Sequence, residues 1–187
     1  MLSRSLLTCV LLLASRAGAE IQDTLAYTYY DAVPKPGQSL SSSLTSASPI
    51  KEDGTVYHGH TKWNVAWTFR WDERDDGTCK ISKATLRVTG TITMPRLIGG
   101  DAEQKRVFEQ YAAALKQHEL GHYQVARDAA AIIDRELLAL PAMKDCGKLE
   151  RAANEGAHET LERQREKERQ YDVSTDHGKT QGAWLGK

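Results

Sequence analysis

The chain lacks an excess of charge of either sign, and it lacks a long hydrophobic run after its first residues. Its 187 residues carry 25 lysines and arginines against 25 aspartates and glutamates. Without a basic excess, the composition gives no reason to expect a nucleic-acid partner. No apolar stretch after residue 19 is long enough to cross a bilayer, so we expect no membrane-spanning segment in the rest of the chain.

The first 19 residues differ from the remainder. Arg4 precedes an apolar run at residues 6–14, and an Ala-Gly-Ala site follows at residues 17–19. A basic start, a short apolar segment and an A-x-A site are typical of a cleaved signal peptide. We therefore expect an exported protein, periplasmic or secreted, whose mature part at residues 20–187 forms a single domain.

Cysteine is scarce as well. Of the three cysteines, Cys9 lies in the expected signal peptide, which leaves Cys79 and Cys146. Exported proteins meet an oxidising environment, in which an even pair of cysteines typically forms a disulfide. We predict a bond between Cys79 and Cys146.

Up to residue 98 the hydrophobic pattern is that of strands. Residues 24–30, 63–71 and 80–94 alternate between apolar and polar side chains, which is the period of a strand with one buried face. Pro95 is expected to end the last of them, and residues 55–60 predict a further strand. A short helix is predicted after Ser39, a residue that commonly caps helices.

After Gly99-Gly100 the apolar period changes to three and four residues, which predicts helices. Asp101 is expected to cap a long first helix that ends before Pro141, and a second, strongly charged helix is predicted over residues 148–170. The fold class predicted is α+β and zincin-like. An N-terminal antiparallel sheet (20–98, mainly β) packs on two long C-terminal helices (101–187, mainly α).

The first long helix carries His118-Glu119-Leu120-Gly121-His122, an H-E-x-x-H pattern. Residues four apart share one helix face, so both imidazoles can bind one zinc ion, and Glu119 lies beside them as a general base. Both histidines fall on the apolar stripe of the helix, where two rings are costly to bury without a partner. Gly121 is expected to let another group approach closely.

A hydrolytic zinc site needs a third protein ligand, and spacing alone leaves several candidates. On the second helix they are Glu155, His158 and Glu159, and near the end of the chain there is His177. The H-x-x-G-x-x-H continuation of metzincins is absent. His58 and His60 are expected to be surface residues, because short histidine tracts are weak metal signals.

Several pieces of the mature chain together resemble a bacterial family of predicted secreted zinc-dependent proteases, otherwise described as a domain of unknown function. The pieces are Trp63-Asn64-Val65-x-Trp67, Cys79 before a strand that ends at Met94-Pro95, the H-E-x-x-H motif, Cys146, Tyr171-Asp172-x-x-Thr175-x-His177-Gly178 and Gln181-Gly182-Ala183. The resemblance implies a zinc site and the Cys79–Cys146 disulfide. It points to His177 as the third ligand, in the polar block that begins at Tyr171.

The function predicted is that of an exported zinc metallopeptidase that acts on a peptide or protein substrate. Zn²⁺ is held by His118, His122 and His177, Glu119 moves the proton from water to the leaving amine, and Tyr171 donates to the oxyanion. Asp172 or Asp176 is a candidate to orient a ligand imidazole. Two alternatives stay open: a non-catalytic envelope-interaction protein that keeps zinc for structure, and a protein that handles zinc itself.

Overall fold

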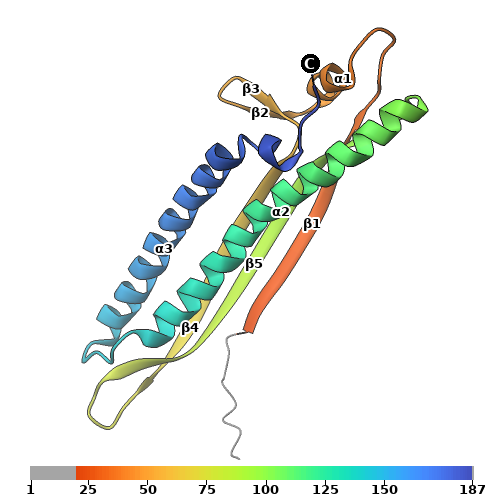
Figure 1. Cartoon of the computed structure of the whole chain (residues 1–187). Coiled ribbons are helices and arrows are strands. Elements are labelled where there is room, and N and C mark those ends of the chain that lie inside the picture. The colour runs from red at the N-terminus through yellow and green to blue at the C-terminus, as the bar shows by residue number, and fades with distance from the viewer. Residues whose placement is uncertain (1–19, 187) are drawn as a thin grey trace, which may run out of the picture.

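The structure is a computed structural model that describes residues 20–186. The predicted signal peptide, residues 1–19, lies outside the described residues. The fold is α+β, as predicted, and it is elongated, with its longest helix running along three long strands (Figure 1). Among the described residues, no helix combines the length and the apolar character needed to cross a membrane.

The main sheet has three strands in the order β1-β5-β4. Their bounds are β1 Glu20–Ala32, β4 His60–Glu73 and β5 Cys79–Leu97. Strands β4 and β5 form an antiparallel hairpin, but β1 pairs in parallel with β5, so the prediction of an entirely antiparallel sheet is wrong. The cause is the chain path. Strand β4 runs opposite to β1. Because β5 turns back from β4 and lies beside β1, it runs in the same direction as β1.

Small elements close one end of the molecule (Figure 1). They are α1 (Leu40–Ala47), a hairpin of β2 (Ile50–Glu52) and β3 (Thr55–Tyr57), and the 3₁₀ helix η1 (Lys179–Gln181). The predicted cap of α1 is confirmed, because the side chain of Ser39 accepts a hydrogen bond from the amide of Ser42.

Two long helices follow the sheet, α2 (Ala102–Ala139) and α3 (Cys146–Thr175). The Asp101 cap is confirmed, and it forms a reciprocal capping box with Gln104. The helices cover the apolar face of the sheet, where alternate residues of β5 such as Leu86 and Val88 are fully buried. The opposite face of β5 presents threonines, since successive side chains of a strand point to opposite faces.

The predicted disulfide is confirmed. Cys79 at the start of β5 is bonded to Cys146 at the start of α3, with their Cα atoms 5.3 Å apart. An apolar cluster surrounds this end of the helix pair. It includes Ile133 and Leu137 of α2 and Leu149 of α3, each at most 2% exposed.

Two boundaries differ from those predicted, and one of them matters for the site. Strand β5 continues through Pro95, because β4 begins opposite Thr93 and the strand has no neighbour on that side beyond this point. Helix α3 continues to Thr175 rather than ending near residue 170. The first half of the polar block at residues 171–178 is therefore helical, and this fixes which of its side chains face α2.

Candidate metal centre

His118 and His122 lie on successive turns of α2, facing the sheet and α3. They are 3% and 7% exposed, and their Nε2 atoms are 3.2 Å apart. The spacing of four residues brings the two rings together, as the H-E-x-x-H pattern predicts. Two imidazoles buried this deeply require polar partners, because an unsatisfied ring nitrogen is costly inside a protein.

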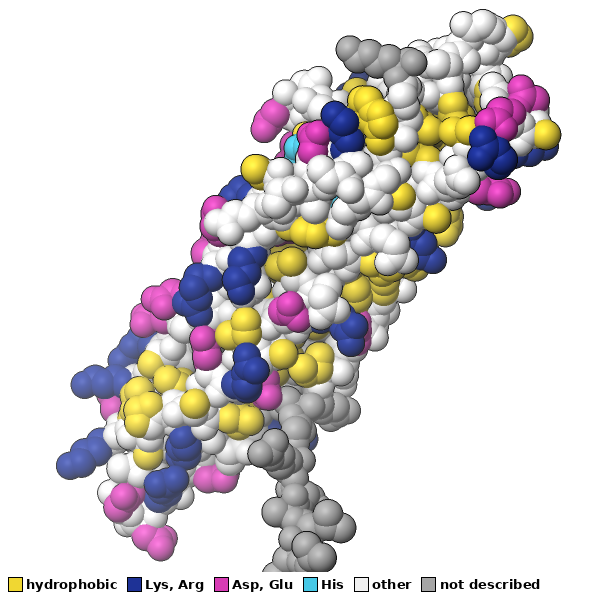
Figure 2. Space-filling view, viewed as in Figure 1, with side chains coloured by type: hydrophobic (Ala, Val, Ile, Leu, Met, Phe, Trp, Pro, Cys, Tyr) yellow, Lys and Arg dark blue, Asp and Glu magenta, His cyan; other side chains and the backbone are white. Residues whose placement is uncertain are grey.

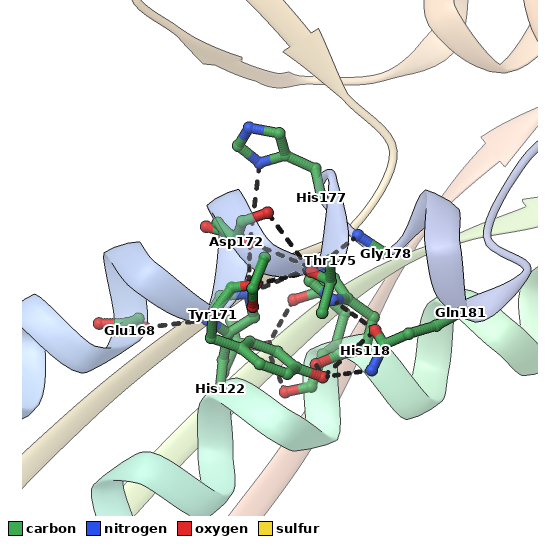
Figure 3. A network of polar contacts seen from close by, with 12 residues as sticks. His118, His122, Glu168, Tyr171, Asp172, Thr175, His177, Gly178 and Gln181 are labelled. Atoms are coloured by element: carbon green, nitrogen blue, oxygen red, sulfur yellow. Dashed lines mark hydrogen bonds and ion pairs between the residues drawn. The ribbon is translucent and has the colours of Figure 1, made fainter.

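The third member of the group is Asp172 of α3 (Figure 3). Its Oδ1 lies 3.1 Å from Nε2 of His118 and 3.0 Å from Nε2 of His122. The three atoms thus form a nearly equilateral triangle. Donors bound to one tetrahedral zinc ion at about 2.0–2.1 Å lie roughly 3.3–3.4 Å apart. The spacing of the three atoms is close to this, so these residues could hold a metal ion. Two histidines and one carboxylate are also a donor set that leaves a fourth position open.

His177, the predicted third ligand, lies outside this triangle. Its Nδ1 is 3.6 Å from Oδ1 of Asp172, its side chain is 49% exposed, and its ring packs on that of Tyr57. The reason is local geometry. Helix α3 ends at Thr175, and both Asp176 and His177, which follow it, have the left-handed backbone conformation, which turns His177 away from the helix axis. The structure therefore groups Asp172, rather than His177, with the two histidines of α2.

The other predicted candidates are far from the histidines. Glu159 precedes Asp172 by 13 residues on the same helix, which corresponds to about 20 Å at 1.5 Å per residue. Its side chain is 75% exposed. His158 packs edge-on against Trp67, and Glu155 is exposed. In the described structure none of the three belongs to the group of residues that could hold an ion.

A second layer of polar groups orients the two imidazoles. Nδ1 of His118 donates to Oε1 of Gln181 at 3.0 Å, which turns Nε2 toward the triangle. Nδ1 of His122 lies 3.4 Å from Glu168, a charged contact whose geometry is not that of a hydrogen bond. Glu168 in turn accepts from the indole of Trp63 at 2.8 Å.

The charges of the metal-free cluster depend on one another. Burial alone would raise the pKa of the Asp172 carboxyl, but hydrogen bonds from His118 and His122 hold it well below its usual range. Burial alone would lower the pKa of His122, but the carboxylates of Asp172 and Glu168 outweigh burial and raise that pKa to about 9. Without an ion, the cluster therefore retains a proton on His122 near neutral pH.

Glu119 is held separately from the triangle. It is 4% exposed, and its Oε2 accepts a hydrogen bond of 2.7 Å from Thr61 of β4. Its Oε1 lies against Gly59, where a Cβ atom would come within 2.4 Å of it. Burial raises the pKa of Glu119, and the hydrogen bond from Thr61 opposes the shift in part. The carboxylate is thus fixed in position and disposed to accept a proton.

Tyr171 lies behind the histidines. Its ring stacks on that of His118, with centroids 5.1 Å apart, and its hydroxyl donates to the carbonyl of His118 at 3.3 Å and accepts from Gln181 at 3.1 Å. The expected close approach at Gly121 is confirmed, since a Cβ atom there would lie 2.2 Å from the Tyr171 hydroxyl. Tyr171 does not line the cleft. Its contacts with the ring and the carbonyl of His118 are those of a residue that supports this histidine.

A cleft of about 760 Å³ opens beside the triangle. Its walls come from the β2–β3 hairpin, the start of β4, the last turns of α3 and the tail that follows η1. His118, His122, Asp172 and Glu119 all line it. His58 and His60, expected at the surface, are both half-buried and line the cleft. The ring nitrogens of His58 are bonded, Nδ1 to Tyr111 and Nε2 to Thr45.

Sequence reasoning missed Asp172 as a ligand candidate and missed Glu168 entirely, although a signal was present. The buried stripe of α3 runs through Leu149 and Leu161 in steps of three and four residues. The same steps continue through Gln164 to Glu168 and Asp172, which places both carboxylates toward α2. The predicted end of the helix near residue 170 left Asp172, but not Glu168, outside the helix.

Comparison with known proteins identifies a family for this chain but does not indicate an activity. The model of a bacterial protein family of unknown function, DUF922, matches residues 27–178. No curated protein and no solved structure matches the chain. The matched range covers most of the chain and includes His118, Glu119, His122, Asp172 and His177. The chain belongs to this bacterial family of unknown function.

Proposed function

We propose that the protein is exported and hydrolyses peptide bonds with a zinc ion held by His118, His122 and Asp172. The observation that carries the proposal is the triangle of donor atoms, with sides of 3.0–3.2 Å, which lies with the buried Glu119 on a cleft of about 760 Å³. The disulfide supports export, because such bonds persist in oxidising compartments.

The proposed division of labour follows from the contacts of each residue. Zinc at such a site supplies a Lewis acid, which activates water and polarises a carbonyl group. Glu119 accepts the proton of the attacking water and returns it to the leaving amine, while Thr61 holds the Oε2 side of the carboxylate. Gln181 and Glu168 orient the rings of His118 and His122.

The test compares zinc content and hydrolysis in the same preparations. The purified mature protein is expected to bind one zinc ion per chain and to cleave a fluorescently quenched casein substrate. Glu119→Gln is expected to keep the zinc and lose cleavage by at least about a hundredfold, since a general base contributes on the order of 10²–10⁴. Equal cleavage by both proteins would reject the role of Glu119.

One observation favours a second candidate, a zinc-containing protein without catalysis. His177 lies only 3.6 Å from Asp172, so a change of its side-chain rotamer would supply a fourth protein ligand and close the site. Such a closed site predicts that His177→Ala weakens zinc binding as strongly as His122→Ala does. The catalytic proposal predicts that His177→Ala retains stoichiometric zinc.

A further inference from the structure

A second hollow lies on the β1 side of α2, and it shares no lining residue with the cleft. It is a groove of about 410 Å³ between β1 and the first half of α2, almost entirely apolar in its lining. In Figure 2, hydrophobic side chains are exposed along this seam. The groove is lined by Tyr27, Tyr29, Met94, Pro95, Arg96, Phe108, Ala112, Ala113 and Lys116.

The strand beside this groove has an open edge. In the part of the chain that the structure describes, β1 is the outer strand of the three-stranded sheet and pairs only with β5 (Figure 1). Its other edge pairs with no strand among the described residues, so a further strand could add to it. Strand β1 contains neither proline nor lysine, the residues that commonly protect an exposed edge from further pairing.

The groove also carries one available positive charge. The ammonium group of Lys116 lies 5.1 Å from the centre of the Tyr27 ring, and no described carboxylate forms an ion pair with it. Arg96, the other cation of the lining, is already paired with Asp31 at 2.7 Å. An acidic group on a ligand would therefore meet Lys116.

We propose that this groove binds an extended peptide segment that adds to the open edge of β1. Strand addition extends the sheet at the open edge of β1, and alternate apolar side chains of the peptide enter the groove between strand and helix. A neighbouring acidic side chain of the peptide pairs with Lys116. The partner class is an extended segment of another protein, with alternating apolar residues and an acidic residue.

The test uses fluorescence anisotropy with the full mature protein. The probe is a fluorescein-labelled octapeptide of alternating valine and threonine with a glutamate at each end. Two control peptides carry the same side chains, each N-methylated on one alternate set of backbone amides. Strand addition predicts that one control binds at least about tenfold more weakly and that the other binds like the probe, because only one set faces β1.

Protein variants locate the site. Lys116→Glu and Ala113→Phe, which reverses the charge and fills the groove, are each expected to weaken probe binding by about tenfold or more. Lys105→Glu, an equal charge change on an exposed residue of α2 outside the groove, is expected to have no effect. Unchanged circular dichroism spectra and melting temperatures in all three variants show that the fold is intact.

Three outcomes would overturn the proposal. They are absence of binding up to about 1 mM probe, equal binding of both N-methylated controls with displacement by dodecanoate, and a dimer in light scattering that Ala113→Phe dissociates. The second would assign the groove to an anionic amphiphile, and the third to a second copy of the chain. None of them depends on the zinc proposal, whose own test is Glu119→Gln.

Discussion

Helices α2 and α3 are joined differently at their two ends. At the disulfide end, Ile133 of α2 and Leu149 of α3 belong to a buried apolar cluster beside the Cys79–Cys146 bond. At the other end, two histidines of α2 meet Asp172 of α3, and Glu168 lies within 3.4 Å of His122. The first contact consists of apolar side chains and a disulfide, which need no further partner. The second keeps charged groups together in a buried place.

This difference separates the contacts that stabilise the helix pair from the group of residues that could hold a metal ion. Apolar side chains stabilise by leaving water and need no further partner. A buried cluster of two imidazoles and a carboxylate is satisfied either by a retained proton or by a cation. The disulfide end therefore stabilises the fold, and in the proposed function the polar end exchanges its proton for a zinc ion. Four predictions test that separation.

The largest expected effect comes from removing the disulfide. The double variant Cys79→Ala/Cys146→Ala opens a loop that spans 67 positions, which lowers the free energy of unfolding by about 4 kcal/mol in the chain-entropy model. Urea denaturation measures the loss. Below the unfolding transition the variant is expected to bind zinc as tightly as the wild type. Loss of zinc from the folded variant would show that the two ends are not independent.

Removal of the ion is expected to make stability depend on pH. His122 has a pKa of about 9 in the folded, metal-free protein and about 6.5 when unfolded, so its proton stabilises the fold by about 3 kcal/mol below pH 6.5. That contribution is lost as the pH rises through 9. Chelator-treated protein should show the loss in thermal melts between pH 6.5 and 9. His122→Asn should not, and an identical pH profile for both would contradict the assignment.

Adding a methyl group at Gly121, between His118 and His122 on α2, is expected to have a smaller effect on stability. In Gly121→Ala the new methyl would lie 2.2 Å from the Tyr171 hydroxyl, so overpacking should cost about 2 kcal/mol and weaken zinc binding. Gly156→Ala is the matched control. No atom lies within 4 Å of its added methyl, and the gain in helix propensity should stabilise α3 by about 0.5–1 kcal/mol. Equal effects of both variants would exclude a specific role for the contact with Tyr171.

The smallest effect is expected from a substitution of Glu168, whose carboxylate lies beside His122. Glu168→Gln removes the charge that faces Nδ1 of His122 and should weaken zinc binding about tenfold, measured by competition with a chelating dye. Glu166→Gln, which alters an exposed pair with Arg169 on the same helix, should leave affinity unchanged. A Glu168→Gln protein with wild-type affinity would remove Glu168 from the centre.

Most of the fold follows from patterns that are local in the sequence. The alternation at residues 63–71, the change of period after Gly99-Gly100 and the cap at Asp101 each predicted an element that the structure contains. The parallel pairing of β1 with β5 did not follow, because strand order depends on contacts between segments more than 60 residues apart. The end of α3 was also misplaced, since charged residues conceal the continuing helical period.

The sequence by itself determined that His118 and His122 share a helix face with Glu119 beside them, because a spacing of four residues has this consequence in any α-helix. It also determined the pair of cysteines that forms the bond. Only the tertiary structure decided which side chain completes the triangle. That choice rests on how far α3 extends and on which of its faces meets α2, and packing between helices distant in sequence sets both, bringing in Asp172 and leaving His177 at the rim.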